Sequence, residues 1–263
     1  MPSQLLTERH QRTLLLTLSD PDSRNSLSPQ AVTAGIEALS VAEGDDGVRC
    51  VVLRGDGGHF CSGGDLRRMK ATRELPPDEG RRVQRQNIDR FHAFIEALQT
   101  FPKPVIAAVD GFAAGAGFSI ALACDLIVAA EDARFVMSYG RVGLTPDGGG
   151  SWQLARALPR ALALQTIWLH EPLDAATLLR LNLVHAVVPA GETSTAALAL
   201  ADRLARLAPN AVASAKELVN AAPSRSLREQ FDAEAAAFVD NLFHANGAEG
   251  MRAFLERRKP DFE

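Results

Sequence analysis

Apolar residues along this chain follow two spacings, one typical of β-strands and one typical of α-helices. Residues 13–18 alternate between apolar and polar side chains, as a strand does, and residues 48–53 form a second apolar run that ends at the glycine turn 55–58. Between these two runs, residues 29–41 carry apolar side chains at helical spacing. The N-terminal part of the chain therefore predicts strand, helix and strand in succession.

The same two patterns continue through the middle of the chain and then change. They predict a long amphipathic helix at 78–100, short strands at 105–109, 126–129, 134–137 and 183–188, and a helix at 152–158. From residue 193 onward only helical spacing remains, with breaks near 208–210 and 222–226. We therefore expect an α/β core over residues 1–192 and a helical region over residues 193–263.

Composition narrows the classes of function. With 263 residues, of which 46% are hydrophobic, the chain can bury a large core, and its net charge of −4 gives no electrostatic footprint for nucleic acid. Its three cysteines include no CxxC pair, which indicates a reducing compartment and no metal site. The first eleven residues lack the apolar stretch of a signal peptide, and the longest uncharged apolar run is too short to span a membrane. We expect a cytoplasmic protein that binds a small molecule.

The segment 111–125, GFAAGAGFSIALACD, joins a glycine and alanine turn to an almost wholly apolar helix. The N-terminus of such a helix presents unpaired N–H groups to a ligand, and small side chains allow the ligand to come close to the backbone. Two other glycine turns follow strands, at 60–65 and at 143–150. Any one of them is explained as a plain turn, but three together favour a site built from loops.

Four blocks in order resemble the crotonase (enoyl-CoA hydratase/isomerase) superfamily along nearly the whole chain. They are VVLRGDGGHFCSGGDL, KPVIAAVDGFAAGAGFSIALACDLIVAAEDARF, VGLTPDGGGSWQLAR and AFLERRKPDF. The resemblance implies an α/β crotonase (ClpP-like) fold, which is a superhelix of repeated ββα units followed by a C-terminal helical region that builds trimers or dimers of trimers. It also implies an acyl-CoA thioester as ligand, with coenzyme A as part of the substrate and no separate cofactor.

The resemblance assigns roles to residues of the first two glycine turns. The N–H groups of Gly64 and Ala116 are the implied oxyanion hole, which would hold the charge that a thioester carbonyl gains in an enolate. Segment 21–26 resembles the Pro-x-x-Arg/Lys-Asn-Ala loop of the family. The further residues implied to contact substrate or coenzyme A are Arg24, Ser26, Ser62, Gly63, Asp65, Leu66, Gly117, Tyr139 and Leu144. For Arg24, a solvated arginine is the alternative interpretation.

Departures from the family pattern decide which reaction is expected. Hydratases of the family carry two glutamates, and this chain has Ser119 and Tyr139 at those places. Neither side chain is a carboxylate base at neutral pH. Asp147 remains, and it resembles the proton-shuttling acid of dienoyl-CoA isomerases and of the ring-opening epoxide isomerase of phenylacetyl-CoA breakdown. We therefore expect an acyl-CoA isomerase. The alternative is that Asp147 caps the helix at 152–158 or the turn before it.

Three other functions stay open at this point. A related aroyl-CoA dehalogenase carries an aspartate like Asp147 and a histidine at about the place of His92, which keeps a hydrolase in view. Residual enoyl-CoA hydratase (lyase) activity is the second alternative. The third is a non-catalytic acyl-CoA or RNA-binding homologue, although the acidic balance argues against RNA. Cys61 stands beside the implied oxyanion loop, and we interpret it as a buried, inert thiol.

Overall fold

The computed structural model describes residues 3–262, and its main element is a six-stranded sheet with the order β1-β2-β3-β4-β6-β9. These strands are β1 (Gln4–His10), β2 (Thr13–Ser19), β3 (Cys50–Gly55), β4 (Val105–Val109), β6 (Leu126–Ala130) and β9 (Ala186–Val188). Only β1 and β2 pair antiparallel; every other neighbouring pair is parallel. A second, smaller sheet holds β5 (Phe112–Ala114), β7 (Arg134–Val136) and β8 (Leu173–Asp174).

The two sheets are linked by a repeated unit of two strands and a helix. β4, β5 and α4 (Ala116–Ala123) form one unit, and β6, β7 and α5 (Gly150–Ala157) form the next. Successive units place β4 beside β6 and β5 beside β7. β3 starts an earlier unit, because Cys61 forms a parallel bridge with Ala113 of β5 and α2 (Leu66–Arg73) follows. This is the expected superhelix of ββα units.

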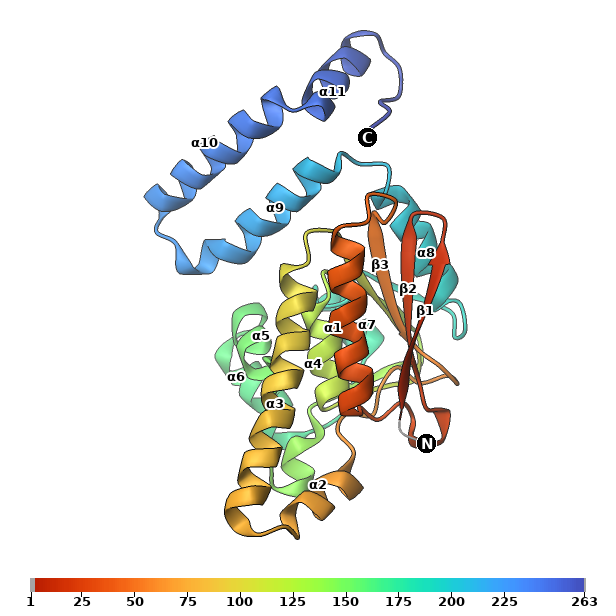
Figure 1. Ribbon diagram of the computed structural model, residues 1–263, viewed down its shortest axis with the longest axis vertical. Helices are drawn as coiled ribbons and strands as arrows, with labels where there is room; N and C mark the ends of the chain where they lie inside the picture. The colour runs from red at the N-terminus through yellow and green to blue at the C-terminus, as the bar shows by residue number, and fades with distance from the viewer. Residues whose placement is uncertain (1–2, 263) are drawn as a thin grey trace.

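The large sheet is packed on both faces, which explains its nearly continuous apolar strands. Leu16, Leu18, Val51 and Leu53 face a core cluster shared with α1 (Pro29–Glu43) and α3 (Pro77–Thr100). Their neighbours Leu15, Cys50 and Val52 face a second cluster that includes α8 (Thr193–Leu204). Figure 1 shows α1 and α3 side by side, with α8 across the sheet from them.

The remaining helices lie around the second sheet and at the C-terminal end. α6 (Arg160–Leu169) and α7 (Ala175–Arg180) follow α5. α9 (Pro209–Ala221), α10 (Leu227–Phe243) and α11 (Ala245–Leu255) extend beyond the sheet in Figure 1, and we call these three helices the C-terminal arm. The part of the chain that packs on the sheet therefore continues through α8. None of the helices described in residues 3–262 is long and apolar enough to cross a membrane.

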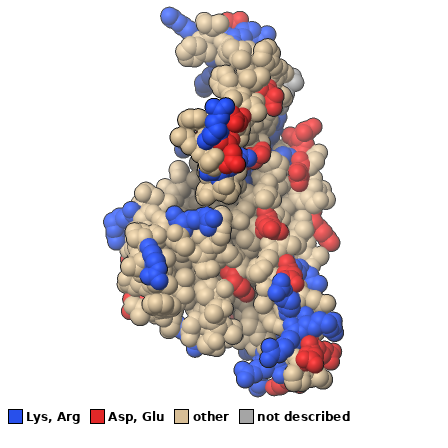
Figure 2. All heavy atoms as spheres, turned by 90° about the vertical axis from the view of Figure 1, so that its left-hand side faces the viewer, with Lys and Arg blue, Asp and Glu red and all other residues tan. Residues whose placement is uncertain are grey.

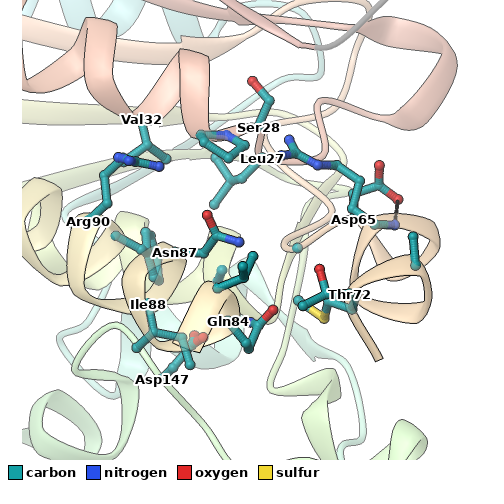
Figure 3. A pocket seen from close by; sticks show the side chains of 18 residues that line it. Leu27, Ser28, Val32, Asp65, Thr72, Gln84, Asn87, Ile88, Arg90 and Asp147 are labelled. Carbon is teal, nitrogen blue, oxygen red and sulfur yellow. Dashed lines mark hydrogen bonds between the residues drawn. The ribbon is translucent and has the colours of Figure 1, made fainter. Parts of the chain in front are cut away.

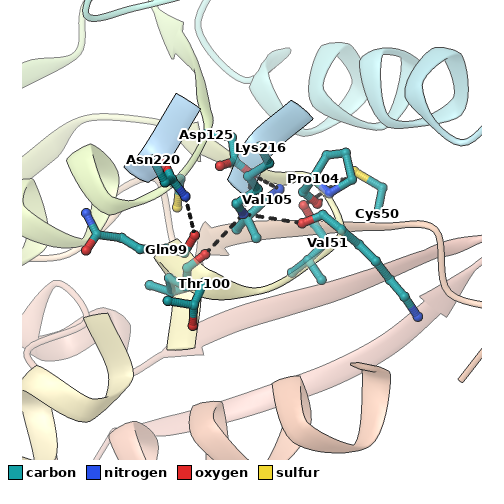
Figure 4. Close-up of polar contacts among 12 residues, drawn as sticks. Cys50, Val51, Gln99, Thr100, Pro104, Val105, Asp125, Lys216 and Asn220 are labelled. Atoms are coloured by element: carbon teal, nitrogen blue, oxygen red, sulfur yellow. Dashed lines mark hydrogen bonds and ion pairs between the residues drawn. The ribbon is translucent and has the colours of Figure 1, made fainter. Parts of the chain in front are cut away.

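A partly buried ion pair attaches the C-terminal arm to the core (Figure 4). Lys216 of α9 donates to Asp125 Oδ2 over 2.8 Å, and the same carboxylate oxygen accepts the N–H of Val105 at 2.7 Å. Asn220, one turn further along α9, donates to the carbonyl oxygen of Gln99 at 3.0 Å. Polar contacts thus fix α9 against the ends of α3 and β4.

The structure confirms most predicted elements and adds several. The apolar helix is α4, the strands at 13–18, 48–53, 105–109, 126–129 and 134–137 are present, and the chain beyond residue 193 is helical. The strand predicted at 183–188 is shorter, and the helix predicted from 152 begins at Gly150. Elements that the spacing did not predict are β1, α2, β5, α6, β8 and α7.

Candidate functional site

Two glycine turns meet in the structure with no room for side chains between them. A Cβ atom on Gly63 would lie 2.7 Å from the carbonyl oxygen of Ala114 and 3.2 Å from the nitrogen of Ala116. A Cβ on Gly117 would lie 2.3 Å from the carbonyl oxygen of Cys61. Gly63 also has a φ of +92°, which glycine adopts without strain. Glycine at these positions therefore brings the loop after Cys61 against the start of α4.

The amides of Gly64 and Ala116 occupy equivalent places in successive ββα units. Each follows by three residues one member of the bridged pair Cys61 and Ala113. Ala116 is the first residue of α4, so its N–H has no partner within the helix. Among residues 3–262, no hydrogen bond from either amide is present. Both residues line one cavity of about 370 Å³, so the structure brings together the two donors that the sequence implied.

Asp147 lines the same cavity and is held by its neighbours (Figure 3). The Tyr139 hydroxyl donates to Oδ1 of Asp147 over 2.5 Å, and the Ser119 hydroxyl donates to the Asp147 carbonyl oxygen over 3.0 Å. Burial raises the pKa of the Asp147 carboxyl above its ordinary value, and the Tyr139 hydrogen bond and the charge of His92 oppose that rise. Such an environment is typical of a carboxylate that exchanges protons.

Asp147 does not cap the following helix. α5 begins at Gly150, and its N-cap residue is Gly149, for which no side chain bonds to the helix. The carbonyl oxygen of Asp147 accepts the N–H of Gly150 at 3.2 Å, while the carboxylate faces Tyr139. Capping of the helix by the Asp147 side chain is therefore wrong, whereas the backbone of Asp147 does close the turn before α5.

The two positions that carry glutamate in family hydratases hold hydroxyl groups here, and both serve the Asp147 turn. Ser119 is fully buried in α4 and bonds the turn's backbone. Burial, followed by the negative charge of Asp147, raises the pKa of Tyr139 well above that of free tyrosine, so its hydroxyl stays protonated. Tyr139 is thus a hydrogen-bond donor to Asp147 rather than a base.

Segment 20–26 packs against the glycine loop at 60–65 and holds it by hydrogen bonds. The N–H of Ser62 donates to the carbonyl oxygen of Arg24 at 2.9 Å, and the Ser62 hydroxyl donates to the carbonyl oxygen of Ser23 at 2.8 Å. The Ser26 hydroxyl contacts that of Ser23 at 2.9 Å. The guanidinium of Arg24 is exposed and lies 5.9 Å from the centre of the Phe112 ring. Arg24, Ser26 and Ser62 do not line the cavity.

The other residues singled out from the sequence differ in whether they line the cavity. His92 is exposed on α3, close enough for its charge to act on Asp147. Leu66 and Leu144 are exposed and do not line the cavity, whereas Asp65 does and also caps α2 through the N–H groups of Arg67 and Arg68. Cys61 is fully buried, as expected, and burial raises the pKa of its thiol to about 12.

Sequence reasoning missed the wall that α2 and α3 contribute. Met69 and Thr72 from α2, and Gln84, Asn87 and Ile88 from α3, line the cavity. The signal for α2 was available: Asp65 is a good N-cap, and Lys70 and Glu74 have the spacing of a helical ion pair. Among residues 3–262, no cluster of three or more His, Cys, Asp or Glu side chains could hold a metal ion.

Comparison with known proteins gives consistent results over the whole chain. The enoyl-CoA hydratase/isomerase family model matches residues 8–263. The chain is 34% identical over 261 residues to the 2,3-dehydroadipyl-CoA hydratase of Escherichia coli, covering 99% of each chain. It is also 34% identical over 259 residues to the 1,2-epoxyphenylacetyl-CoA isomerase of the same organism, covering 98% of this chain and 97% of that one.

Solved structures support the same comparison. The crystal structure of an enoyl-CoA hydratase from Polaromonas sp. JS666 matches with a TM-score of 0.96 and 50% sequence identity, over 99% of this chain and all of that one. A second hydratase structure, from Geobacillus kaustophilus, matches with a TM-score of 0.90 at 32% identity, over 99% of this chain and 98% of that one. The similarity therefore includes the fold as a whole and is not confined to the glycine motifs.

Proposed function

The chain belongs to the enoyl-CoA hydratase/isomerase family, and from this premise we propose that it is an acyl-CoA isomerase that works through a thioester enolate. The single observation that carries the proposal is the cavity where one carboxylate, Asp147, meets two unpaired backbone N–H groups, those of Gly64 and Ala116. A carboxylate and an oxyanion hole are the two groups that a 1,3-proton shift requires.

In the proposed reaction, the Asp147 carboxylate removes a proton from a carbon next to the thioester or conjugated with it. The electron pair of the broken C–H bond moves toward the carbonyl oxygen, where the N–H groups of Gly64 and Ala116 stabilise the negative charge. Asp147 then returns a proton, which can exchange with solvent while it is on the carboxyl group, to a different carbon, and the electron pair forms the new C–H bond. The step is balanced without a water molecule or a redox cofactor.

The electrostatics of Asp147 suit this role. Burial raises the pKa of Asp147 above its ordinary value, which makes the carboxylate a stronger base and allows its protonated form to exist closer to neutral pH, where it can return the proton. The Tyr139 hydroxyl opposes that rise and holds one carboxylate oxygen in place. The other oxygen makes no hydrogen bond within the part of the chain that the structure describes, so it remains free for the substrate proton.

Three further assignments belong to the same proposal. Coenzyme A would enter only as part of the substrate, with Arg24 as its phosphate contact. The three buried, free cysteines, Cys50, Cys61 and Cys124, fit a cytoplasmic location. A trimer would bring three acyl-CoA sites together, and a dimer of trimers six, through the exposed apolar side chains of the C-terminal arm.

The decisive experiment measures exchange of substrate protons with solvent deuterium for a panel of acyl-CoAs, because exchange reports an enolate whatever the product. Asp147→Asn should lower exchange and turnover by roughly 10²–10⁴-fold while acyl-CoA affinity changes little, since proton transfer needs the carboxylate. Asp89→Asn, an exposed acid on α3, is the matched control. An Asp147→Asn enzyme with near wild-type exchange would contradict the proposal.

Hydration is the second candidate, because the solved structure at 50% identity is that of an enoyl-CoA hydratase. Water addition requires a held and deprotonated water molecule, which Ser119 and Tyr139 are poorly suited to provide. We therefore expect slow hydration of crotonyl-CoA. A wild-type rate equal to that of an efficient hydratase would instead indicate that Asp147 holds and deprotonates the water molecule. Exposed His92 is the group to test for a hydrolytic alternative, and His92→Gln should abolish hydrolysis in that case but should not abolish isomerisation.

A further inference from the structure

The wall of the cavity that α3 forms holds two side-chain amides, those of Gln84 and Asn87, among the apolar side chains of Val83, Ile88 and Phe91. Gln84 and Asn87 stand one helical turn apart on α3, and both are half-buried cavity residues. Figure 3 shows both side chains extending from α3 into the space between this helix, α2 and the start of α1. Side chains three residues apart share one face of a helix, so the two amides present a common surface to a ligand.

Neither amide is used within the protein. No hydrogen bond among residues 3–262 involves the side chain of Gln84 or of Asn87, although a side-chain amide has two N–H donors and an acceptor oxygen. Polar groups that lose water when a ligand enters need a replacement partner, or their desolvation opposes binding. A plain hydrocarbon chain cannot provide that partner.

Charges around the cavity favour a ligand whose hydrogen-bond acceptor carries a negative charge. Arg68 and Arg90 line the cavity, are exposed, and have no ion pair in the described part of the chain. Figure 2 shows lysine and arginine side chains gathered at the end of the molecule formed by α2 and the start of α3. The two acids of the wall are already engaged, because Asp65 caps α2 and Asp147 accepts from Tyr139.

We propose that the acyl group of the substrate carries a hydrogen-bond-accepting oxygen at its distal end, which Gln84 and Asn87 bind and which Arg90 favours when the oxygen belongs to a carboxylate. The inference rests on the proposed function only for the placement of the thioester at Gly64 and Ala116. Cavities of a few hundred Å³ accommodate small ligands, and 370 Å³ suits a short acyl chain with its terminal group.

The test uses saturated acyl-CoAs, which bind without isomerising, so that its result is independent of the role of Asp147. Calorimetry compares hexanoyl-CoA, 6-hydroxyhexanoyl-CoA and 5-carboxypentanoyl-CoA, which have the same chain length. At least one of the two oxygen-bearing ligands should bind about tenfold more tightly than hexanoyl-CoA, the gain typical of a hydrogen-bonded terminal group. Equal or tighter binding of hexanoyl-CoA would overturn the proposal.

Variants then identify the side chains that cause the preference for an oxygen-bearing ligand. Gln84→Leu and Asn87→Leu should remove most of the tenfold preference by strengthening hexanoyl-CoA binding and weakening that of the oxygen-bearing ligands. Arg90→Met should affect only the carboxylate ligand. Gln86→Leu, an exposed glutamine on the same helix that does not line the cavity, should change nothing. A preference that survives both cavity variants, with melting curves that show folded protein, would also overturn the proposal.

Discussion

At the scale of single residues, the contact between Tyr139 and Asp147 controls the chemistry of the site. Burial pushes the pKa of Asp147 up, and the hydroxyl of Tyr139 pulls it down by stabilising the charged carboxylate. The balance sets the pH range in which the carboxylate can accept a proton. Tyr139 acts through Asp147, so it is a positioning residue in the proposed mechanism.

Tyr139→Phe removes the hydrogen bond and leaves the ring in place. The pKa of Asp147 should then rise further, because its largest remaining influence is burial. Activity depends on the deprotonated carboxylate, so it is lost as the pH falls through this pKa. The acid limb of the kcat/KM profile should therefore move to higher pH in the variant, which a pH series of initial rates measures.

A purely structural role for Tyr139 predicts a different result. In that case kcat/KM would fall by the same factor at every pH, with the acid limb unmoved. Ser119→Ala is the matched control, because the Ser119 hydroxyl donates to the carbonyl oxygen of Asp147 and not to its carboxylate. Its pH profile should keep the wild-type acid limb.

At the scale of elements, the ββα repeat fixes the position of the start of α4. Ala116→Pro removes one proposed oxyanion donor, and proline is tolerated at the first position of a helix, where the N–H has no helical partner. Turnover should fall by roughly 10²–10³-fold, as when other oxyanion donors are lost. Ala116→Ser, which keeps the N–H, is the control. Full activity in a folded Ala116→Pro protein would exclude this donor.

The attachment of α9 to the core is the second feature at this scale. Lys216 is only 10% exposed, and its ion pair with Asp125 satisfies a carboxylate whose pKa burial raises. Lys216→Met should lower the free energy of unfolding by about 2 kcal/mol at neutral pH, because it leaves a partly buried charge without its partner. Urea unfolding measures this loss, and Lys216→Met combined with Asp125→Asn should recover part of it.

The same pair gives a pH dependence with a definite sign. Without Lys216 the pKa of Asp125 rises further, so acid protonates this carboxylate more readily in the folded than in the unfolded chain. Protonation removes the unpaired charge. The destabilisation by Lys216→Met should therefore be smaller at acidic pH than at pH 8, and a deficit that is constant across this range would contradict the explanation.

Elements could be predicted from the sequence where a clear pattern of apolar residues was present. They were missed where the element was exposed or very short. α4 is apolar on every side and β3 is a continuous apolar run, so both were evident. β1 is an edge strand with mostly exposed residues, and α2 has no buried residue, so neither shows a burial pattern. β5 has only three residues and was hidden within a predicted turn.

The residues of the candidate site likewise include some that the sequence predicted and some that it did not. Gly64, Ala116 and Asp147 were singled out through the resemblance to the family, whose glycine motifs are local stretches of the sequence. The pairing of Tyr139 with Asp147, and the cavity wall formed by Gln84 and Asn87, depend on how α3 and the third turn meet in space. No local pattern gives that geometry, since α3 presents its glutamines and asparagine as ordinary polar positions of an amphipathic helix.

At the scale of the whole molecule, the C-terminal arm leaves an apolar surface without a partner in a single chain. Phe238, Phe243 and Phe254 on α10 and α11 are 69%, 84% and 83% exposed, and Leu255 is 80% exposed. Monomeric proteins rarely expose contiguous patches of this kind, and closed cyclic assemblies bury them. We therefore expect the arm to pack against other copies of the chain.

Light scattering should give a mass of three or six times the 28.2 kDa chain at micromolar concentration. Phe238→Asp combined with Phe243→Asp should lower that mass toward one chain, because carboxylates would have to be buried at the interface. Val41→Asp, at an equally exposed apolar position on α1, should leave the assembly intact. A wild-type protein that stays monomeric would show that the arm has another role, whereas dissociation by Val41→Asp as well would place the interface on the core and not on the arm.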